Sequence, residues 1–413
     1  MPTTVVERFG AVSATSVKKE TTFGTVATGA VAGDFTPMTG NSLQLDPGLF
    51  FPKIMVGQRD QNVFPLYGQA KNAGALDFAL MPTNAATIIP GTIGVDGAIG
   101  NGVTGTGSAN ASTLNGSVSA GATSVVLTSG TGYTIGLFIQ IDVNLAGTTT
   151  SEVRKITNLV TNTVSFAEPL IYGHLSGAAT KVVTAPFTHT FTQTNFTLPS
   201  YTIEKNLGGA ESLQFAGARF GKIDIKCQAT NSEVSVTADV QAKSVAVLGS
   251  PTAPAYVSEQ PYVFAEAALT LFGNTVNHAT TTQFTLSNTL KDTYTMNSTR
   301  NLNFLSPVAR TLDLKSDVVF YNLDDAAWGW HTLMVNQAAG SQAAGSYVLS
   351  LTHPSNGGTW SFTAPTCYIK NVSQSIKIDD VIMETVSMTA AFNVSTSTTL
   401  TGSLVSPSVY VAY

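Results

Sequence analysis

Polar and apolar residues alternate over much of the chain, and the alternation is most regular between Glu233 and Gln241. The polar positions of this segment are Glu233, Ser235, Thr237, Asp239 and Gln241, and the apolar positions are Val234, Val236, Ala238 and Val240. A period of two residues predicts a β-strand with one face on a hydrophobic core. The polar face, acidic at two positions, is expected to look at solvent, a substrate or a larger partner.

Similar alternation predicts a chain built mainly of strands. Residues 187–206 predict two strands, and residues 212–244 predict a hairpin that turns near Thr230 and Asn231. A Pro-rich connector at 249–262 is unsuited to a central strand, because proline has no backbone N–H to donate. Further strands are predicted between residues 267 and 321 and between residues 346 and 413.

One helix interrupts these strands. It is predicted to start near Asp324 and Asp325, because two acidic residues favour a helix N-terminus. The pattern therefore predicts a mainly β fold, a β-sandwich or split β-barrel, with one flanking helix.

Composition divides the chain into three parts. Residues 1–45 are small, polar and without a clear period, which predicts an extended N-terminal arm. The Gly/Ser/Thr-rich stretch 91–112 is typical of a flexible linker. Residues 112–184 predict a small inserted β-barrel or sandwich of five strands, at 124–128, 137–143, 151–157, 163–166 and 180–183. Residues 46–111 and 185–413 are then the main domain.

A faint internal repeat links two segments of the main domain. Glu233–Ser244 and Thr385–Thr396 have the same length and alternation and lie 152 residues apart. Each follows a stretch of Ile, Lys and Asp, at 222–226 and at 376–380. Two copies of one hairpin element suggest a sheet that presents the same polar face twice, although a bulge or coincidence would also give this pattern.

Charge and composition favour a protein that works inside an assembly. Only 11% of the 413 residues are charged and the net charge is −5, so polarity comes from Ser, Thr, Asn, Gln and Gly. The longest cationic run is Lys18–Lys19, which argues against tight nucleic-acid binding. We expect no secretory signal in residues 1–10 and no membrane span.

No catalytic, cofactor or metal motif is found in the sequence. The five histidines are isolated from one another, and Cys227 and Cys367 have no metal spacing. We expect these cysteines to be buried free thiols, with a single disulfide as the alternative. Asp379, Asp380 and Glu384 could bind a cation, but adjacent acids in a loop are usually solvated. A chain of this length without catalytic residues is expected to be a structural or binding protein and not an enzyme.

Two short motifs carry a resemblance to a known family. The first is Pro199, Ser200, Thr202, Ile203 and Glu204, and the second is Phe215, Gly217, Arg219 and Phe220. Together with segments 270–320 and 366–394, they resemble the tail tube proteins of tailed bacteriophages. The resemblance covers about 58–98 and 187–394, and it leaves out residues 1–45 and 112–184.

The resemblance implies a structural virion protein of a phage tail, made in the host cytoplasm. Its subunits would form hexameric rings that stack into a tube, and double-stranded DNA would pass through the bore without specific binding. Tape measure, tail terminator and distal tail proteins would be its partners. The insert would lie on the tube exterior, which favours a long, non-contractile tail.

The alternating polar residues are then candidates for the wall of the bore. The predicted lumen-facing residues are Glu233, Ser235, Thr237, Asp239, Gln241, Ser387, Thr389 and Asn393. If the sheet were reversed, Val234 and Val240 would face the bore instead. The alternatives are a capsid decoration or head-closure protein, and a bacterial surface adhesin or carbohydrate-binding protein.

Overall fold

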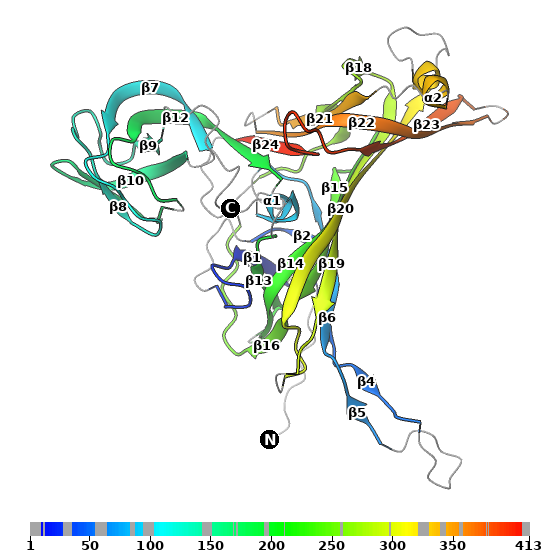
Figure 1. The fold of residues 1–413 in the computed structure, drawn as a ribbon, viewed down its shortest axis with the longest axis horizontal. Helices are drawn as coiled ribbons and strands as arrows, with labels where there is room; N and C mark the ends of the chain where they lie inside the picture. Colours follow the sequence, from blue (N-terminus) through cyan, green and yellow to red (C-terminus); the bar gives the residue numbers. More distant parts are fainter. Residues whose placement is uncertain are drawn as a thin grey trace.

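The structure is a computed structural model, and the part of the chain that it describes has several gaps. The described residues are 10, 13–27, 35–53, 64–82, 87–93, 103–142, 151–167, 169–170, 172–193, 198–209, 211–256, 259–296, 299–320, 330–338, 344–354, 358–376, 378 and 380–406. The fold is mainly β, as predicted, and its strands pair antiparallel (Figure 1).

One long, twisted sheet forms the main body of the molecule. Its strands, in spatial order, are β6 (Lys71–Ala79), β15 (Ser235–Ala242), β14 (Ser212–Gln228), β19 (Ala279–Thr293), β20 (Phe304–Val319), β23 (Met383–Ala390) and the second half of β22 (Thr359–Ser375). The short strands β2 (Met38–Asn41) and β3 (Gln44–Asp46) line the outer edge of β6. β14 and β15 form the predicted hairpin, since residues 229–234 connect them.

Two smaller groups of strands extend from β14 and β22 and cover one face of the long sheet. The first half of β14 pairs with β13 (Tyr201–Asn206) and β16 (Ser244–Leu248), and β13 pairs with β1 (Ala14–Lys19). The first half of β22 pairs with β21 (Gly345–Thr352) and β24 (Thr401–Ser406). β21 continues to β17 (Ala267–Leu271), which pairs with β18 (Asn274–Val276) and follows a short 3-10 helix at Phe264–Glu266.

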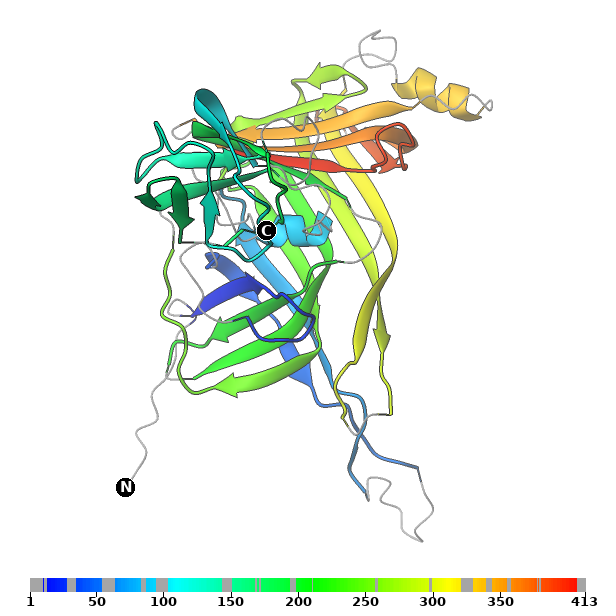
Figure 2. The ribbon, with the colours of Figure 1, turned by 60° about the vertical axis from the view of Figure 1, so that its left-hand side comes forward.

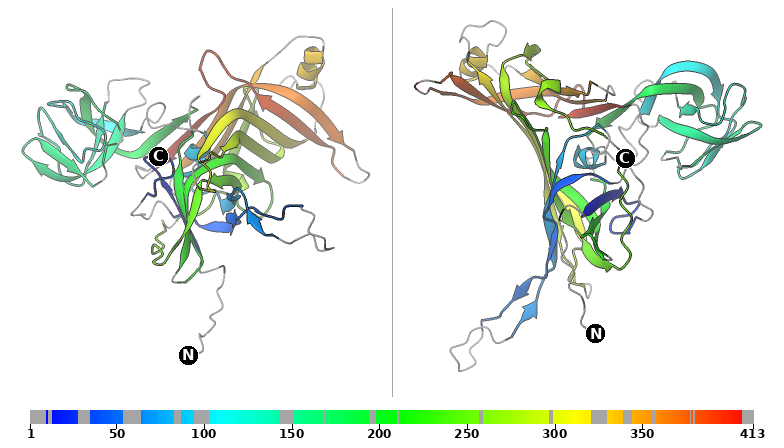
Figure 3. Two further views of the ribbon diagram at one scale, coloured as in Figure 1. Left: turned by 60° about the horizontal axis from the view of Figure 1, so that its bottom comes forward. Right: turned by 180° about the vertical axis from the view of Figure 1, so that it is seen from behind.

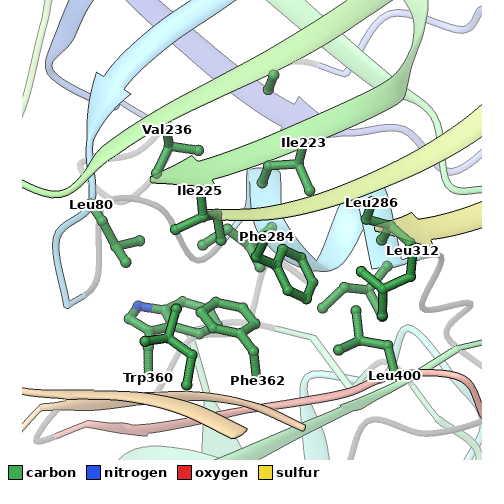
Figure 4. Close-up of a cluster of buried hydrophobic side chains, with 14 of the residues drawn as sticks. Leu80, Ile223, Ile225, Val236, Phe284, Leu286, Leu312, Trp360, Phe362 and Leu400 are labelled. Atoms are coloured by element: carbon green, nitrogen blue, oxygen red, sulfur yellow. The ribbon is translucent and has the colours of Figure 1, made fainter. Parts of the chain in front are cut away.

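The main core lies between the long sheet and these two groups. Trp360 and Phe362 of β22 face Ile225, Phe284 and Leu312 of the long sheet (Figure 4). The ring centroids of Phe284 and Phe362 are 5.3 Å apart, and each of the five residues is at most 1% exposed. Alternation places these residues on one face, and removing that apolar surface from water stabilises the sandwich.

Two helices accompany the strands. α2 (Trp330–Ala338) is the flanking helix, and the predicted start at Asp324 and Asp325 lies outside the described residues. α1 (Ile88–Ile93) was not predicted, since it contains Pro90 and Gly91. All of α1 is buried, and it packs mainly against β14.

The insert has a hydrophobic core of its own. Its strands are β8 (Ser124–Val126), β9 (Phe138–Ile141), β10 (Glu152–Val160) and β11 (Thr163–Phe166), with β7 (Val103–Thr113) and β12 (Ala179–Thr192) leading in and out. The buried cluster includes Val125, Tyr133, Ile139, Ile156 and Val164. In Figures 2 and 3 the insert stands at one side of the long sheet, attached by β7 and β12.

Two expectations about the N-terminal segment and the linker were wrong within the described residues. Residues 14–19, 38–41 and 44–46 are strands of the sandwich, and Val17 is fully buried, so residues 1–45 are not a separate arm. The stretch 91–112 is not a flexible linker where it is described, because β7 pairs with β12 along its length. Ladder hydrogen bonds hold β7 in spite of its Gly/Ser/Thr composition. The last predicted strand, 406–413, lies outside the described residues after Ser406.

Candidate functional site: the polar face of the long sheet

The predicted polar residues of β15 lie on the face of the long sheet that points away from the core. Ser235 and Asp239 are exposed, and Thr237 and Gln241 are half-buried. Val234, Val236, Ala238 and Val240 are buried in the main core. The reversed arrangement, with Val234 and Val240 on the open face, therefore does not occur in this chain. We call the open side of the long sheet the polar face.

Cross-strand register extends the polar face over six strands. One row consists of Asp77, Thr237, Asp224, Thr285, Asp313 and Thr389, from β6, β15, β14, β19, β20 and β23 in turn. The adjacent row consists of Ser235, Lys226, Gln283, Lys315 and Ser387. Neighbouring strands therefore present carboxylates beside hydroxyls, with lysines one row away.

Hydroxyl and amide donors hold the carboxylates of this face. Thr237 Oγ1 donates to Asp77 Oδ1 at 2.7 Å. Gln283 Nε2 donates to both carboxylate oxygens of Asp224, at 3.0 and 2.7 Å. Cross-strand pairs of this kind stabilise a sheet and keep the side chains lying along its surface.

Lysines balance the acids of the polar face. Lys370 Nζ lies 3.0 Å from Asp313 Oδ1, and Lys315 Nζ lies 3.7 Å from Asp317 Oδ1. Both pairs are largely exposed, so each contributes little to stability. Their effect is on the surface charge, because the carboxylate in each pair offsets the charge of the lysine beside it.

The second predicted segment shares this face only in part. Ser387 and Thr389 lie on β23 and belong to the two rows, as predicted for a face presented twice. Asn393 does not, because β23 ends at Ala390. Its side chain accepts from the backbone N–H groups of Ser395 and Thr396 and donates to Thr366 Oγ1. Glu233 precedes β15, where it is exposed and forms an isolated bridge with Val263.

Most residues that carry the tail-tube resemblance lie inside the sandwich and not on the polar face. The exception is Arg219, which is half-buried opposite Gln241 and donates to the carbonyl of Leu305. Glu204 is buried and accepts from Ser212 Oγ at 3.0 Å and Thr252 Oγ1 at 2.7 Å. Buried Glu20 of the N-terminal segment accepts from Thr202 Oγ1 at 2.9 Å and from the N–H of Gly217 at 2.8 Å. These motif residues therefore join β1, β13 and β14 and have a structural role.

Other candidate chemistry is not assembled within the described residues. These residues contain no cluster of His, Cys, Asp and Glu that could hold a metal ion. Asp379 is outside them, Asp380 is exposed, and Glu384 is buried, where His331 Nε2 lies 3.0 Å from Oε1. The two described acids, Asp380 and Glu384, thus do not form a shared cation site.

Both cysteines are free and buried, as expected for structural thiols. Burial raises the pKa of Cys227 to about 11 and of Cys367 to about 12. Because the thiolate is the nucleophilic form, neither side chain is suited to react near neutral pH.

The insert contains a buried charged network that the sequence did not reveal. His174 Nδ1 contacts Asp142 Oδ2, and Nε2 lies 3.0 Å from Glu152 Oε1. Glu152 also pairs with Arg154, whose guanidinium donates to the carbonyl of Pro169. Glu152 and Arg154 are neighbours on β10, whereas Asp142 and His174 come from two other segments, so only the folded insert brings the four side chains together.

Comparisons with known proteins give no family for this chain. No family model matches it, and no curated protein matches it. Among the described helices, none is long and apolar enough to cross a membrane.

Proposed function

We propose that this chain is a structural virion protein that forms stacked rings of a phage tail tube, with six repeats of one sheet unit around each bore. The polar face lines the bore, through which the genome is delivered to the host. The observation that carries the proposal is the continuous polar face over six strands, backed by a single hydrophobic core.

The chemistry of this face suits a conduit for a polyanion. DNA binds tightly where clustered lysines or arginines release its counterions. Here Lys315 and Lys370 lie beside Asp317 and Asp313, and the rest of the two rows is Ser, Thr, Gln and Asp apart from the single lysine Lys226. A wall of this kind would neither trap nor strongly repel DNA as it slides past.

The position of the insert supports the same orientation. Figure 1 shows it beyond β24 and β12, on the core side of the long sheet and away from the polar face. With the polar face toward the bore, the insert lies on the exterior of the tube.

Electron microscopy of the purified recombinant protein tests this proposal. We expect rings with six-fold repetition or long hollow tubes, with Thr237 and Asp224 facing the bore in a reconstruction. Persistent monomers at high concentration, or tubes whose polar face points outward, would contradict it.

A further inference from the structure

Most strands of the main domain, together with its two helices, occur twice in the same order along the chain, and β18 has no counterpart among the described strands. The first set is β1, β2–β3, β6, α1, β13, β14, β15 and β16. The second set is β17, β19, β20, α2, β21, β22, β23 and β24. β14 and β22 are both 17 residues long. Each pairs through its first half with two short strands and through its second half with the strand that follows it.

Irregularities of the ladders recur at the same places. Register shifts occur between Phe220 and Lys222 in β14–β15 and between Ile369 and Asn371 in β22–β23. A second matched pair of shifts lies between Met38 and Gly40 in β2–β6 and between Ala279 and Thr281 in β19–β20. A third lies between Tyr201 and Ile203 in β13–β14 and between Gly345 and Tyr347 in β21–β22. Bulges are specific features of a fold, so three matched pairs identify a tandem duplication.

The duplication aligns individual side chains. Thr237 Oγ1 donates to Asp77, and Thr385 Oγ1 donates to Asp317 Oδ1 at 2.6 Å, in corresponding strand pairs. Thr385 and not Thr389 is therefore the counterpart of Thr237, so the repeat seen in the sequence was four residues out of register. The sequence repeat also paired 376–380 with 222–226. Residues 222–226 belong to β14, whose counterpart is β22, and the described residues 376, 378 and 380 lie in no strand.

One seam joins the two repeats within the chain. The second half of β14 pairs with the start of β19, from Lys222 opposite Ser287 to Gln228 opposite Thr281. The second half of β22 corresponds to the β14 side of this seam, and β2–β3 correspond to the β19 side. Neither edge has such a neighbour among the described strands. Residues 371–375 of β22 pair only with β23, and β2 and β3 pair only with β6.

The β2–β3 edge carries marks of a missing strand. Leu45 is 47% exposed, whereas its counterpart Leu286 is fully buried opposite Ile223 of β14. Nearby, the carbonyls of Asn41 and Leu43 accept from Lys205 Nζ at 2.9 and 3.0 Å, so a side chain supplies the donors there. The counterpart of Ile223 is Val372, which is half-buried at the other open edge.

We propose that the second half of β22 pairs with β2–β3 of a second copy of this chain, in the register of the β14–β19 seam. Asn371 then lies opposite Asp46, Ser373 opposite Gln44, and Ser375 opposite Ser42. Val372 covers Leu45 of the next copy, as Ile223 covers Leu286. The polar face continues unbroken from one chain to the next.

This interface is head-to-tail, so repetition closes a ring or continues as a helix. Each chain supplies two of the repeats. The count of six repeats per ring rests on the proposed function. Because each chain supplies two repeats, three chains, and not six, complete each ring.

A designed disulfide tests the interface. Ser373→Cys and Gln44→Cys are combined in one chain, because both residues are exposed and opposite in the proposed register. Under oxidation we expect covalent species of two and three chains on a denaturing gel and none larger. The matched control pairs Gln44→Cys with Gln374→Cys, which points to the other face of the strand and is expected to cross-link poorly.

The outcomes separate this inference from the proposed function. Rings without interchain disulfides in the Ser373/Gln44 variant would overturn the edge pairing but leave the tube proposal. A covalent series that extends to six chains would overturn the three-chain ring. Native mass spectrometry of wild-type rings provides an independent count, with three chains expected and six contradicting it. Monomers alone, without cross-links, would overturn both proposals.

Discussion

His174 is the residue on which the charged network of the insert depends. Both of its ring nitrogens face carboxylate oxygens, and a neutral imidazole has only one N–H to donate. Burial alone would lower the pKa of His174, but the hydrogen bonds and charges of Glu152 and Asp142 outweigh it, and the pKa is raised. The imidazolium is thus the form that fits its surroundings.

This raised pKa predicts how the stability of the insert depends on pH. The contribution of His174 to the free energy of unfolding is fully present below its unfolded pKa of about 6.5. It is lost as pH rises through the raised folded value. Titration of the imidazole by NMR gives the folded pKa directly, and urea unfolding across this range gives the stability. A folded pKa at or below the ordinary value would contradict the prediction.

His174→Gln removes the cation and leaves buried carboxylates behind. We expect a loss of about 3 kcal/mol for breaking a buried pair in this way, and a flatter pH profile. His353→Gln is the matched control, because His353 is also buried but lies beside Tyr262 in the main domain. An unchanged pH profile in the His174 variant would show that another group titrates.

Single residues of this kind could not be assigned from the sequence. Asp142, Glu152, Arg154 and His174 follow no spacing motif, and their proximity depends on how the insert folds. The polar residues of β15 were predictable, because strict alternation with Val234, Val236 and Val240 places them on the opposite face of any strand. Asn393 was misplaced, because alternation in the sequence continues past Ala390, where the strand ends.

Among the strands and helices, the elements with clear alternation were the predictable ones. β14 and β15 form the predicted hairpin, and β19 and β20 lie in the stretch 267–321 where strands were predicted, although each is longer than the alternation alone indicated. α1 has no helical period, because Ile88 and Ile93 are buried together with Pro90 and Gly91 between them. β7 has a linker composition and is a strand only because β12 offers it a ladder of hydrogen bonds.

Gly217 shows how one element of the predicted motif is constrained. Its φ is +66°, and a Cβ there would lie 2.7 Å from Lys243 Cβ. We expect Gly217→Ala to lower the free energy of unfolding by at least about 1–2 kcal/mol, the cost of the left-handed conformation for a residue with Cβ. Urea unfolding measures this loss.

Gly249→Ala is the matched control for this substitution. Gly249 has no atom within 4 Å of an added Cβ and no positive φ. We expect its stability to be close to that of the wild type. A Gly217 variant as stable as the Gly249 variant would mean that the backbone of β14 at this position relaxes without cost.

At the scale of the whole molecule, the sequence indicated a repeat but not a duplication. The two copies share bulges and pairing order while their side chains differ, as with Leu43 and Phe284 or Phe78 and Val318. A sheet requires only that apolar residues alternate with polar ones, so identity between the copies can fall while the pairing stays. The insert hides the duplication further, since it separates α1 from β13 in the first copy alone.

The insert is expected to be dispensable for assembly. β7 and β12 are already paired at Gly105 and Phe187, next to the main domain. Replacing residues 106–186 with Asn-Gly would close them as a two-residue hairpin. Phe187→Thr is included in the same variant, because this ring packs against Phe138 of the insert, with the centroids 5.0 Å apart.

We expect this variant to form the same rings or tubes as the full chain. Because the insert occurs once for every two repeats, each full-length ring should carry three outer projections, and the variant should carry none. Electron microscopy of both proteins under the same conditions makes the comparison. Loss of assembly in a variant whose main domain still unfolds cooperatively would place the insert in a contact between subunits. Projections that alternate with bare repeats around a ring would support both its exterior position and the two-repeat chain.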